Sequence, residues 1–344
     1  MLDGTKTLAD EVPHDLGEDH TRDTPLDART LASVIIVLGM LAGLSVPHLA
    51  ELAAPFVMPA LFILGVASLT PLRDALPKFI AHIDKCLVAG VVWLQFGLPA
   101  VVVVLCIAIG VPAKIAALLL VSATASLVFA SPAIAQIIGL DRRCVTHLMI
   151  ATTLAMPFSL PLFLSPFVDF DGPGIFLLYA ERVAIFLVLP LAIVIAMGWA
   201  LRPRSARTNV AVDQTSHWIS VVALGVFAVG ITDGVAETFA AHPGEIVSML
   251  VAIVLLGVLM YAATWLVFPA ERAKLANVLS IFSLTRNVGL SYAVVGHVFG
   301  PELAIYVALC QIPALCLPLI LRIKSTNKRD GPVDSQMTAY GSVK

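Results

Sequence analysis

The sequence contains few charged residues. Lys, Arg, Asp and Glu together make up 13% of the 344 residues, whereas an average soluble domain has about 25%. No basic patch is interleaved with aromatic residues and no zinc-ligand spacing is present, so the sequence offers no nucleic-acid-binding signal. The five cysteines are an odd number and most lie in apolar runs, which argues against a disulfide framework.

The residue sets of an enzyme are missing as well. No cluster of metal-ligating residues, no nucleophile paired with a histidine and no His-Asp set within an apolar run is present. We therefore predict that the chain is not an enzyme and that it has no cofactor and no resident metal site.

The chain is unusually rich in long hydrophobic segments. Hydrophobic residues make up 59% of it, and its mean hydropathy is +0.96. A membrane-spanning helix needs about 20 apolar residues. Ten segments fit this requirement: 30–48, 51–70, 86–109, 113–139, 144–166, 175–200, 217–240, 245–268, 273–299 and 301–322. The sequence therefore predicts an all-α polytopic membrane protein with ten transmembrane helices.

Basic residues alternate between successive loops. Lys and Arg occur in loops 71–85, 140–143, 201–216 and 269–274, whereas the intervening loops hold only Lys114. Because basic loops favour the cytoplasmic side, the pattern predicts an even number of spans in the cell (inner) membrane, with both termini cytoplasmic. Segment 1–29 is acidic and has no secretory signal, and 323–344 is polar, so both are predicted to be disordered tails.

Ten spans divide into two sets of five, residues 30–166 and 167–322. An odd number of spans per set would invert the second set relative to the first, as in many secondary transporters. A short internal sequence similarity supports this division. Residues 113–116 (AKIA) recur as 273–276 (AKLA), and residues 122–126 parallel residues 283–287. We predict two inverted five-helix repeats in which the fourth and ninth helices are broken.

The most polar stretch inside an apolar run is 283–289, with the sequence SLTRNVG. A charged group at bilayer depth is costly and marks a substrate or ion path by default. We predict that Thr285, Arg286 and Asn287 bind the substrate at a helix break, with Ser283 as a candidate ion ligand. The alternative is an intact helix whose Arg286 ties two helices together by hydrogen bonds.

Polar residues in three other spans are candidates for the same site. Thr124 and Ser126 of the fourth span would bind the substrate together with the ninth span, although such hydroxyls also serve helix packing. Gln95 either bonds to a neighbouring helix or faces backbone groups freed beside Pro99. Thr152 is either an ion ligand or the repair of a proline kink.

Two acidic residues and two histidines lie nearer to span ends. Asp233 and Glu237 are four residues apart and so share a helix face. They are either proton-carrying coupling residues or an acidic face at the membrane interface, where charge costs less. His147 and His297 lie near helix ends, where we expect solvated rings.

Several short motifs resemble the bile acid/sodium symporter superfamily, which also includes arsenite exporters and relatives of plant auxin carriers. They are residues 58–66, Gln95-Phe96 before Pro99, residues 124–126, and residues 286–290 followed by Tyr306 and by 311–313. The likeness covers about residues 30–322. It implies a panel of helices 1, 2, 6 and 7 and a core of helices 3–5 and 8–10, in which broken helices 4 and 9 cross.

The resemblance also implies ligand positions, because sodium-coupled members bind Na⁺ at positions that correspond to Gln95, Ser126, Thr152 and Asn287. Three positions differ from that pattern. Phe282 and Arg286 replace a Glu and a Gln of the ninth helix, and Leu127 replaces an Asn after Ser126. A fixed cation where a bound one would lie disfavours Na⁺.

We therefore predict a secondary active transporter that moves a small organic anion, a monocarboxylate or a bile-acid-like molecule, by alternating access without a strict need for Na⁺. Alternatives are a sodium-coupled symporter of the same family and a membrane receptor or scaffold that does not transport. An arsenite exporter would want a thiol in the fourth helix, which has none. The expected partners are the anionic solute and the lipid bilayer, with no obligate protein partner.

Overall fold

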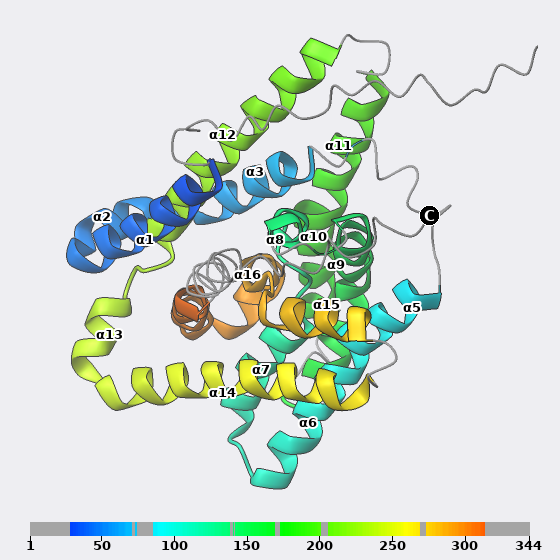
Figure 1. Ribbon diagram of the computed structural model, residues 1–344. Helices are drawn as coiled ribbons and strands as arrows, with labels where there is room; N and C mark the ends of the chain where they lie inside the picture. Colours follow the sequence, from blue (N-terminus) through cyan, green and yellow to red (C-terminus); the bar gives the residue numbers. More distant parts are fainter. Residues whose placement is uncertain are drawn as a thin grey trace, which may run out of the picture.

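Helices account for every named element of the computed structural model, which describes residues 28–70, 73, 85–137, 140, 142–168, 173–200, 206–268 and 273–313 (Figure 1). The predicted tails, 1–29 and 323–344, thus lie outside the described residues except for positions 28 and 29. The same holds for the predicted tenth span beyond residue 313.

Six of the described helices are long and apolar enough to cross a membrane. They are Pro47–Leu69, Leu87–Ile109, Arg143–Leu164, Phe176–Ala200, Ala211–Ala241 and Pro243–Val267. Large apolar side chains such as Phe158, Leu177 and Leu266 are exposed on them, as on a surface that faces lipid. This architecture confirms the predicted class, an all-helical membrane protein.

Three of these helices change type along their length. The first consists of α2 (Pro47–Ala53), the 3-10 turn η1 (Ala54–Phe56) and α3 (Val57–Leu69). In the other two, the π-helix η4 (Trp93–Gly97) joins α5 (Lys85–Val92) to α6 (Leu98–Ile109), and the π-helix η5 (Ala184–Val188) joins α10 (Pro173–Val183) to α11 (Leu189–Ala200). Pro99 and Pro190 each lie two residues beyond a π-helix. A proline donates no backbone hydrogen bond, which favours such a local change of register.

The predicted fourth and ninth spans are each interrupted, as expected. The fourth consists of α7 (Ala113–Thr124) and α8 (Ser131–Ile137), and the ninth of α15 (Ala273–Leu284) and α16 (Val288–Phe299). α7 and α15 both have 12 residues and start 160 positions apart (273 minus 113). The helix ends therefore align Thr124 with Leu284. The internal sequence similarity aligns Thr124 with Thr285 instead, so it differs from the structural alignment by one residue.

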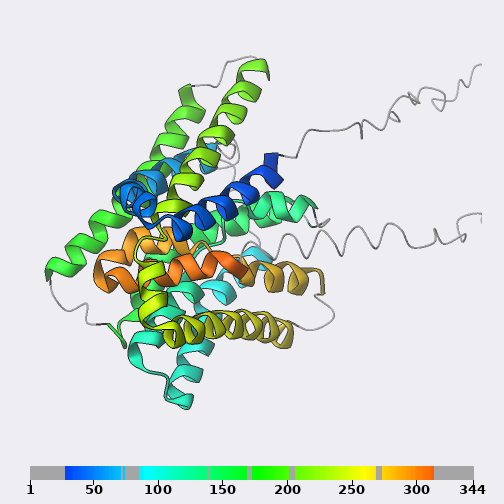
Figure 2. The same ribbon diagram turned by 90° about the vertical axis from the view of Figure 1, so that its left-hand side faces the viewer.

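The remaining helices are α1 (Ala28–Ser45), α9 (Arg142–Leu164), α12 (Ala206–Gly230), α13 (Val235–Ala241) and α14 (Pro243–Val267). Residues 301–313 are helical too. α12 packs on α1, α2 and α3, while α14 packs on α15, α7 and α6 (Figures 1 and 2). α16 lies between these two groups and contacts α3, α7 and α10.

Glycines allow α1, α2 and α12 to approach closely. A Cβ added to Gly43 of α1 would lie 2.8 Å from the Val229 carbonyl oxygen, and one added to Gly230 of α12 would lie 2.8 Å from the Ala53 carbonyl oxygen. Small residues at such contacts are how membrane helices gain packing energy without a hydrophobic driving force.

We expect Gly230→Ala to destabilise the protein by about 1–3 kcal/mol, because the added methyl group meets backbone that cannot move aside cheaply. The measurement is the thermal unfolding midpoint of the purified protein, followed by tryptophan fluorescence. Gly244→Ala is the matched control, since a Cβ there has no neighbour within 4 Å. Equal midpoints for the two variants would contradict the close-packing interpretation.

Candidate functional site at the crossing of the broken helices

The two helix interruptions meet and pair. Leu127 and Arg286 form an antiparallel bridge. The Val128 N–H donates to the Thr285 carbonyl (3.1 Å), and the Asn287 N–H donates to the Ser126 carbonyl (2.7 Å). Each break thus satisfies backbone groups that the other has freed, as non-helical backbone at membrane depth requires. We call residues 125–128 and 285–287 the crossing.

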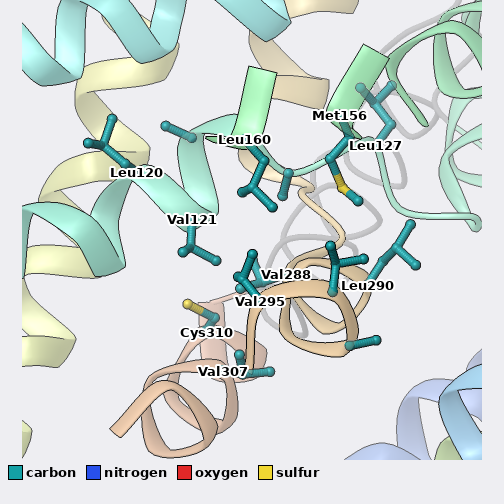
Figure 3. Packing of buried hydrophobic residues seen from close by; sticks show 14 of the residues in the cluster. Leu120, Val121, Leu127, Met156, Leu160, Val288, Leu290, Val295, Val307 and Cys310 are labelled. Carbon is teal, nitrogen blue, oxygen red and sulfur yellow. The ribbon is translucent and has the colours of Figure 1, made fainter. Parts of the chain in front are cut away.

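Apolar side chains surround the crossing. Buried residues from α7, α9, α16 and the helix 301–313 belong to the same apolar cluster as Leu127 of the crossing, among them Leu120, Met156, Val288 and Val307 (Figure 3). Two helices end there, α7 at Thr124 and α15 at Leu284. Because a helix C-terminus carries partial negative charge on its last carbonyls, a cation is favoured beside these two ends.

Arg286 supplies that cation. Its side chain is 7% exposed, and it donates from Nε to the Ser283 carbonyl (3.2 Å), from Nη1 to the Ala125 carbonyl (3.0 Å) and from Nη2 to the Leu94 carbonyl (3.1 Å). Within the described part of the chain it forms no ion pair. Backbone dipoles therefore offset part of this charge. Both interpretations from the sequence hold in part, because the helix is broken and Arg286 also joins separate helices.

The Leu94 carbonyl is available because of the π-helix before Pro99. In this register the Leu98 N–H bonds to the Trp93 carbonyl, five residues earlier. The next donor in the series would be the nitrogen of Pro99, which carries no hydrogen. The Leu94 carbonyl therefore has no such donor within its own helix and accepts from Arg286 instead.

Gln95 and Thr152 also reach the crossing. Gln95 donates from Nε2 to the Ala125 carbonyl (3.3 Å), and its Oε1 accepts from the Ser159 hydroxyl (2.8 Å). The Thr152 hydroxyl accepts from the Leu127 N–H (3.3 Å) and donates to the Met149 carbonyl (3.0 Å). Both predicted ion ligands thus act here as hydrogen-bonding links between helices.

Three hydroxyl groups near the crossing have no hydrogen-bond partner among the residues that the structure describes. Ser126 and Ser131 are 0% exposed and Thr285 is 4% exposed, and their oxygen atoms make no hydrogen bond. Unpaired buried polar groups are rare in folded proteins, and each calls for a ligand, a water molecule or another explanation. Ser126 and Thr285 are two of the predicted substrate-binding residues.

The other three predicted residues of this region are satisfied within their own helices. The Thr124 hydroxyl donates to the Leu120 carbonyl (2.7 Å), and the Ser283 hydroxyl donates to the Ser280 carbonyl (2.7 Å). Asn287 caps α16, because its Oδ1 accepts from the Leu290 N–H (3.2 Å). The Asn287 amide nitrogen and the second lone pair of Oδ1 remain available to a ligand.

The two acidic candidates lie away from the crossing. Asp233 is exposed in the turn between α12 and α13, and Glu237 is exposed in the first turn of α13. Neither shares a hydrogen bond with the residues of the crossing. This placement favours the acidic surface over the proton-carrying pair.

Sequence reasoning missed some contacts. The Ser159 hydroxyl lies within hydrogen-bonding distance of Gln95 Oε1 (2.8 Å) and of the Met156 carbonyl in its own helix (3.4 Å). Ser122 at the end of α7 hydrogen-bonds to the Tyr306 hydroxyl (2.9 Å), which ties α7 to the helix 301–313. The prediction of a solvated His297 is wrong, since both of its ring nitrogens are buried. Position near a helix end could not show that α10 packs against α16.

Among the described residues, no group of His, Cys, Asp and Glu is placed to hold a metal ion. Neither a protein-family model nor a curated protein matches the chain. Its function therefore has to be inferred from the geometry of the crossing.

Proposed function

We propose that this protein is a secondary active transporter that moves a small organic anion across the cell (inner) membrane by alternating access. The observation that carries the proposal is the buried Arg286 guanidinium, held by three backbone carbonyls where two broken helices cross. Intramembrane charge marks a substrate or ion path by default. Broken helices that meet inside the membrane are a common way to build a transport site.

The remaining hydrogen-bonding capacity of the crossing suits an anion. A guanidinium has five N–H donors, and three are directed at carbonyls, so two remain for a ligand. The unpartnered hydroxyls of Ser126 and Thr285 are further donors in the same region. Because no acidic side chain pairs with Arg286 in the described residues, a carboxylate would complete the charge balance. A monocarboxylate or a bile-acid-like molecule has this chemistry.

The same geometry supports transport without a strict need for Na⁺. Carbonyl oxygens from Leu94, Ala125 and Ser283 are the kind of ligands that hard cations take, and here they all face the guanidinium of Arg286. A bound Na⁺ beside Arg286 would be repelled at short range in a medium of low dielectric constant. Arg286 thus acts as a built-in cation.

The proposal includes ten spans in two inverted five-helix repeats, a panel and a core domain, cytoplasmic termini, and a distant relationship to the bile acid/sodium symporter superfamily. The equal lengths of α7 and α15 and their common Ala-Lys start support the repeat. Inverted repeats place equivalent segments antiparallel to each other. The antiparallel bridge between Leu127 and Arg286 at the crossing therefore supports the inversion.

The decisive experiment is uptake of radiolabelled monocarboxylates into proteoliposomes that contain the purified protein. We expect saturable uptake that persists when choline replaces Na⁺, measured with and without a proton gradient. Uptake that requires Na⁺ would favour the sodium-coupled alternative. The hydrogen bonds from Arg286 to three backbone segments also suit a membrane receptor or scaffold that does not transport. If none of the radiolabelled monocarboxylates is taken up, this alternative is favoured.

The unpartnered hydroxyls give a second, residue-level prediction. Ser126→Ala and Thr285→Val should weaken anion binding about fivefold to tenfold, because each removes a hydrogen bond worth about 1–1.5 kcal/mol. Their thermal midpoints should barely change, since neither hydroxyl has a hydrogen-bond partner in the described part of the chain. Thr124→Val is the matched control, because that hydroxyl bonds to its own helix. Loss of stability with unchanged affinity would argue against a ligand at these groups.

A further inference from the structure

The π-helix η4 is connected to two of the three carbonyl groups that accept hydrogen bonds from Arg286. The Leu94 carbonyl belongs to η4 itself. The Ala125 carbonyl is bonded to η4, because it also accepts from the side chain of Gln95 (3.3 Å). A displacement of η4 would therefore disturb two of the groups that orient the guanidinium. The position of Arg286 thus depends on what keeps η4 in place.

Trp93, the residue before Leu94, fixes η4 to α14. Its indole N–H donates to the Thr264 hydroxyl (3.0 Å), and that hydroxyl donates its own proton to the Met260 carbonyl, one turn earlier in α14 (2.8 Å). The direction of the first bond is fixed, since an indole nitrogen can only donate. Thr264 is 0% exposed, so a methyl group in place of its hydroxyl would remove a buried acceptor.

The indole ring is held by packing as well. It makes an edge contact with the ring of Phe268 at the end of α14, with 6.0 Å between the ring centroids. It also covers Gly97 at the end of η4, where an added Cβ would lie 2.4 Å from the Trp93 ring. Gly97 therefore leaves the room that the indole occupies.

α14 also supports the third acceptor of Arg286. Gly257 and Thr264 are seven residues apart, which places them about two turns apart on one face of α14. A Cβ added to Gly257 would lie 3.3 Å from the Leu284 side chain at the end of α15. The neighbouring Ser283 carbonyl accepts from Arg286 Nε. α14 and α15 lie side by side (Figure 1), so one helix supports both η4 and the end of α15.

We propose that Trp93 and Thr264 are positioning residues of the anion site: their hydrogen bond fixes η4 against α14 and thereby orients the Arg286 guanidinium toward a bound carboxylate. Both residues act through the Leu94 carbonyl, and the bonds of Arg286 itself go to backbone groups. The part played in anion recognition rests on the proposed function, whereas the orientation of Arg286 does not.

The first test observes Arg286 directly and needs no ligand. The full-length protein is labelled with ¹⁵N-arginine in phosphatidylcholine nanodiscs, and the Arg286 Nε–H resonance is assigned by its loss in Arg286→Gln. Thr264→Val keeps the shape of the side chain but removes the acceptor, and Trp93→Phe keeps an aromatic ring but removes the donor. We expect both variants to shift the Arg286 resonance. Thr264→Ser keeps the hydroxyl and should leave this resonance near its wild-type position.

Two comparisons separate positioning from a general loss of stability. Trp218→Phe makes the same exchange at an exposed site on α12 and should not shift the Arg286 resonance. The double variant with Trp93→Phe and Thr264→Val should shift it little further than either single variant, because both changes remove the same bond. An Arg286 resonance that is unchanged in both single variants would overturn the proposal.

The second test measures what this orientation contributes to recognition. The binding of radiolabelled benzoate to the same protein is compared with that of its neutral amide, benzamide. Thr264→Val should lower the benzoate affinity roughly twofold to tenfold, the range that hydrogen bonds between membrane helices cover, while benzamide binds as before. Thr264→Ser should restore the wild-type ratio of the two affinities. A Thr264→Val protein with the wild-type ratio would show that the pair serves the fold alone.

Failure of the proposed function has a different signature. In that case the wild type would bind no benzoate and take up no monocarboxylate, while the Arg286 resonance would still respond to Thr264→Val and not to Thr264→Ser. This combination would remove the transporter and leave the orientation of Arg286 by Trp93 and Thr264 in place.

Discussion

Replacing Arg286 by glutamine is expected to lower the affinity for anionic solutes roughly tenfold to a hundredfold while neutral analogues bind as before. The physical reason is the loss of a charge-assisted contact, worth about 1.5–3 kcal/mol, at a buried position. Arg286→Lys should restore only part of the affinity, because an ammonium cannot form the two parallel bonds of a guanidinium with a carboxylate. The measurement compares the binding of a radiolabelled monocarboxylate with that of its neutral amide.

Another buried arginine provides the control. Arg73 is 3% exposed and pairs with Asp213 near the end of α3. Arg73→Gln should reduce stability, because it removes the pair with the 45% exposed Asp213 and a buried hydrogen bond to the Thr70 carbonyl, but the ratio of anion to amide affinity should not change. An Arg286→Gln protein with the wild-type ratio would show that the guanidinium holds helices together and plays no part in recognising the solute.

The crossing could be predicted from the sequence because a charged residue inside an apolar run is energetically costly and easy to recognise. Arg286 and Asn287 stand in an apolar run, and few structures allow a charge at that depth. The helix break and the use of helix-end carbonyls to balance the charge follow from this constraint, whereas the pairing with residues near Ser126 was predicted from the similarity between residues 122–126 and 283–287 and from the family resemblance. The six membrane-length helices were visible for a similar reason, since the length of an apolar run can be read directly from the order of the residues.

Other features depend on geometry that the sequence does not specify. The Leu94 carbonyl becomes available only because a π-helical register places its missing donor at Pro99. Which hydroxyls remain free depends on rotamers, so Thr124 turns to its own helix whereas Thr285 is left unpaired. The burial of the His297 ring nitrogens depends on how α16 packs against other elements, α10 among them. Local patterns carry no information of this kind.

Truncation of Arg286 to alanine is expected to create a cation site that can be refilled from solution. The carbonyls of Leu94, Ala125 and Ser283 would each lose a donor, and an unsatisfied buried polar group costs about 1–3 kcal/mol. We therefore expect a marked fall in the thermal midpoint. Free guanidinium ion, at low concentrations that do not denature the protein, should reverse this fall, because a ligand at a hundred times its dissociation constant adds about 2.7 kcal/mol of stability.

Leu127→Ala is the matched control for this rescue. Leu127 is 0% exposed and lies directly opposite Arg286 in the bridge, so its truncation leaves a cavity and costs about 2–5 kcal/mol without removing a hydrogen-bond donor. Guanidinium should raise the midpoint of Arg286→Ala and leave those of Leu127→Ala and the wild type unchanged. Equal responses of the two variants would mean that the carbonyls rearrange when the side chain is lost. In that case the ends of α7 and α15 would not form a preorganised cation site, and Arg286 would not be the built-in counterpart of a coupling ion.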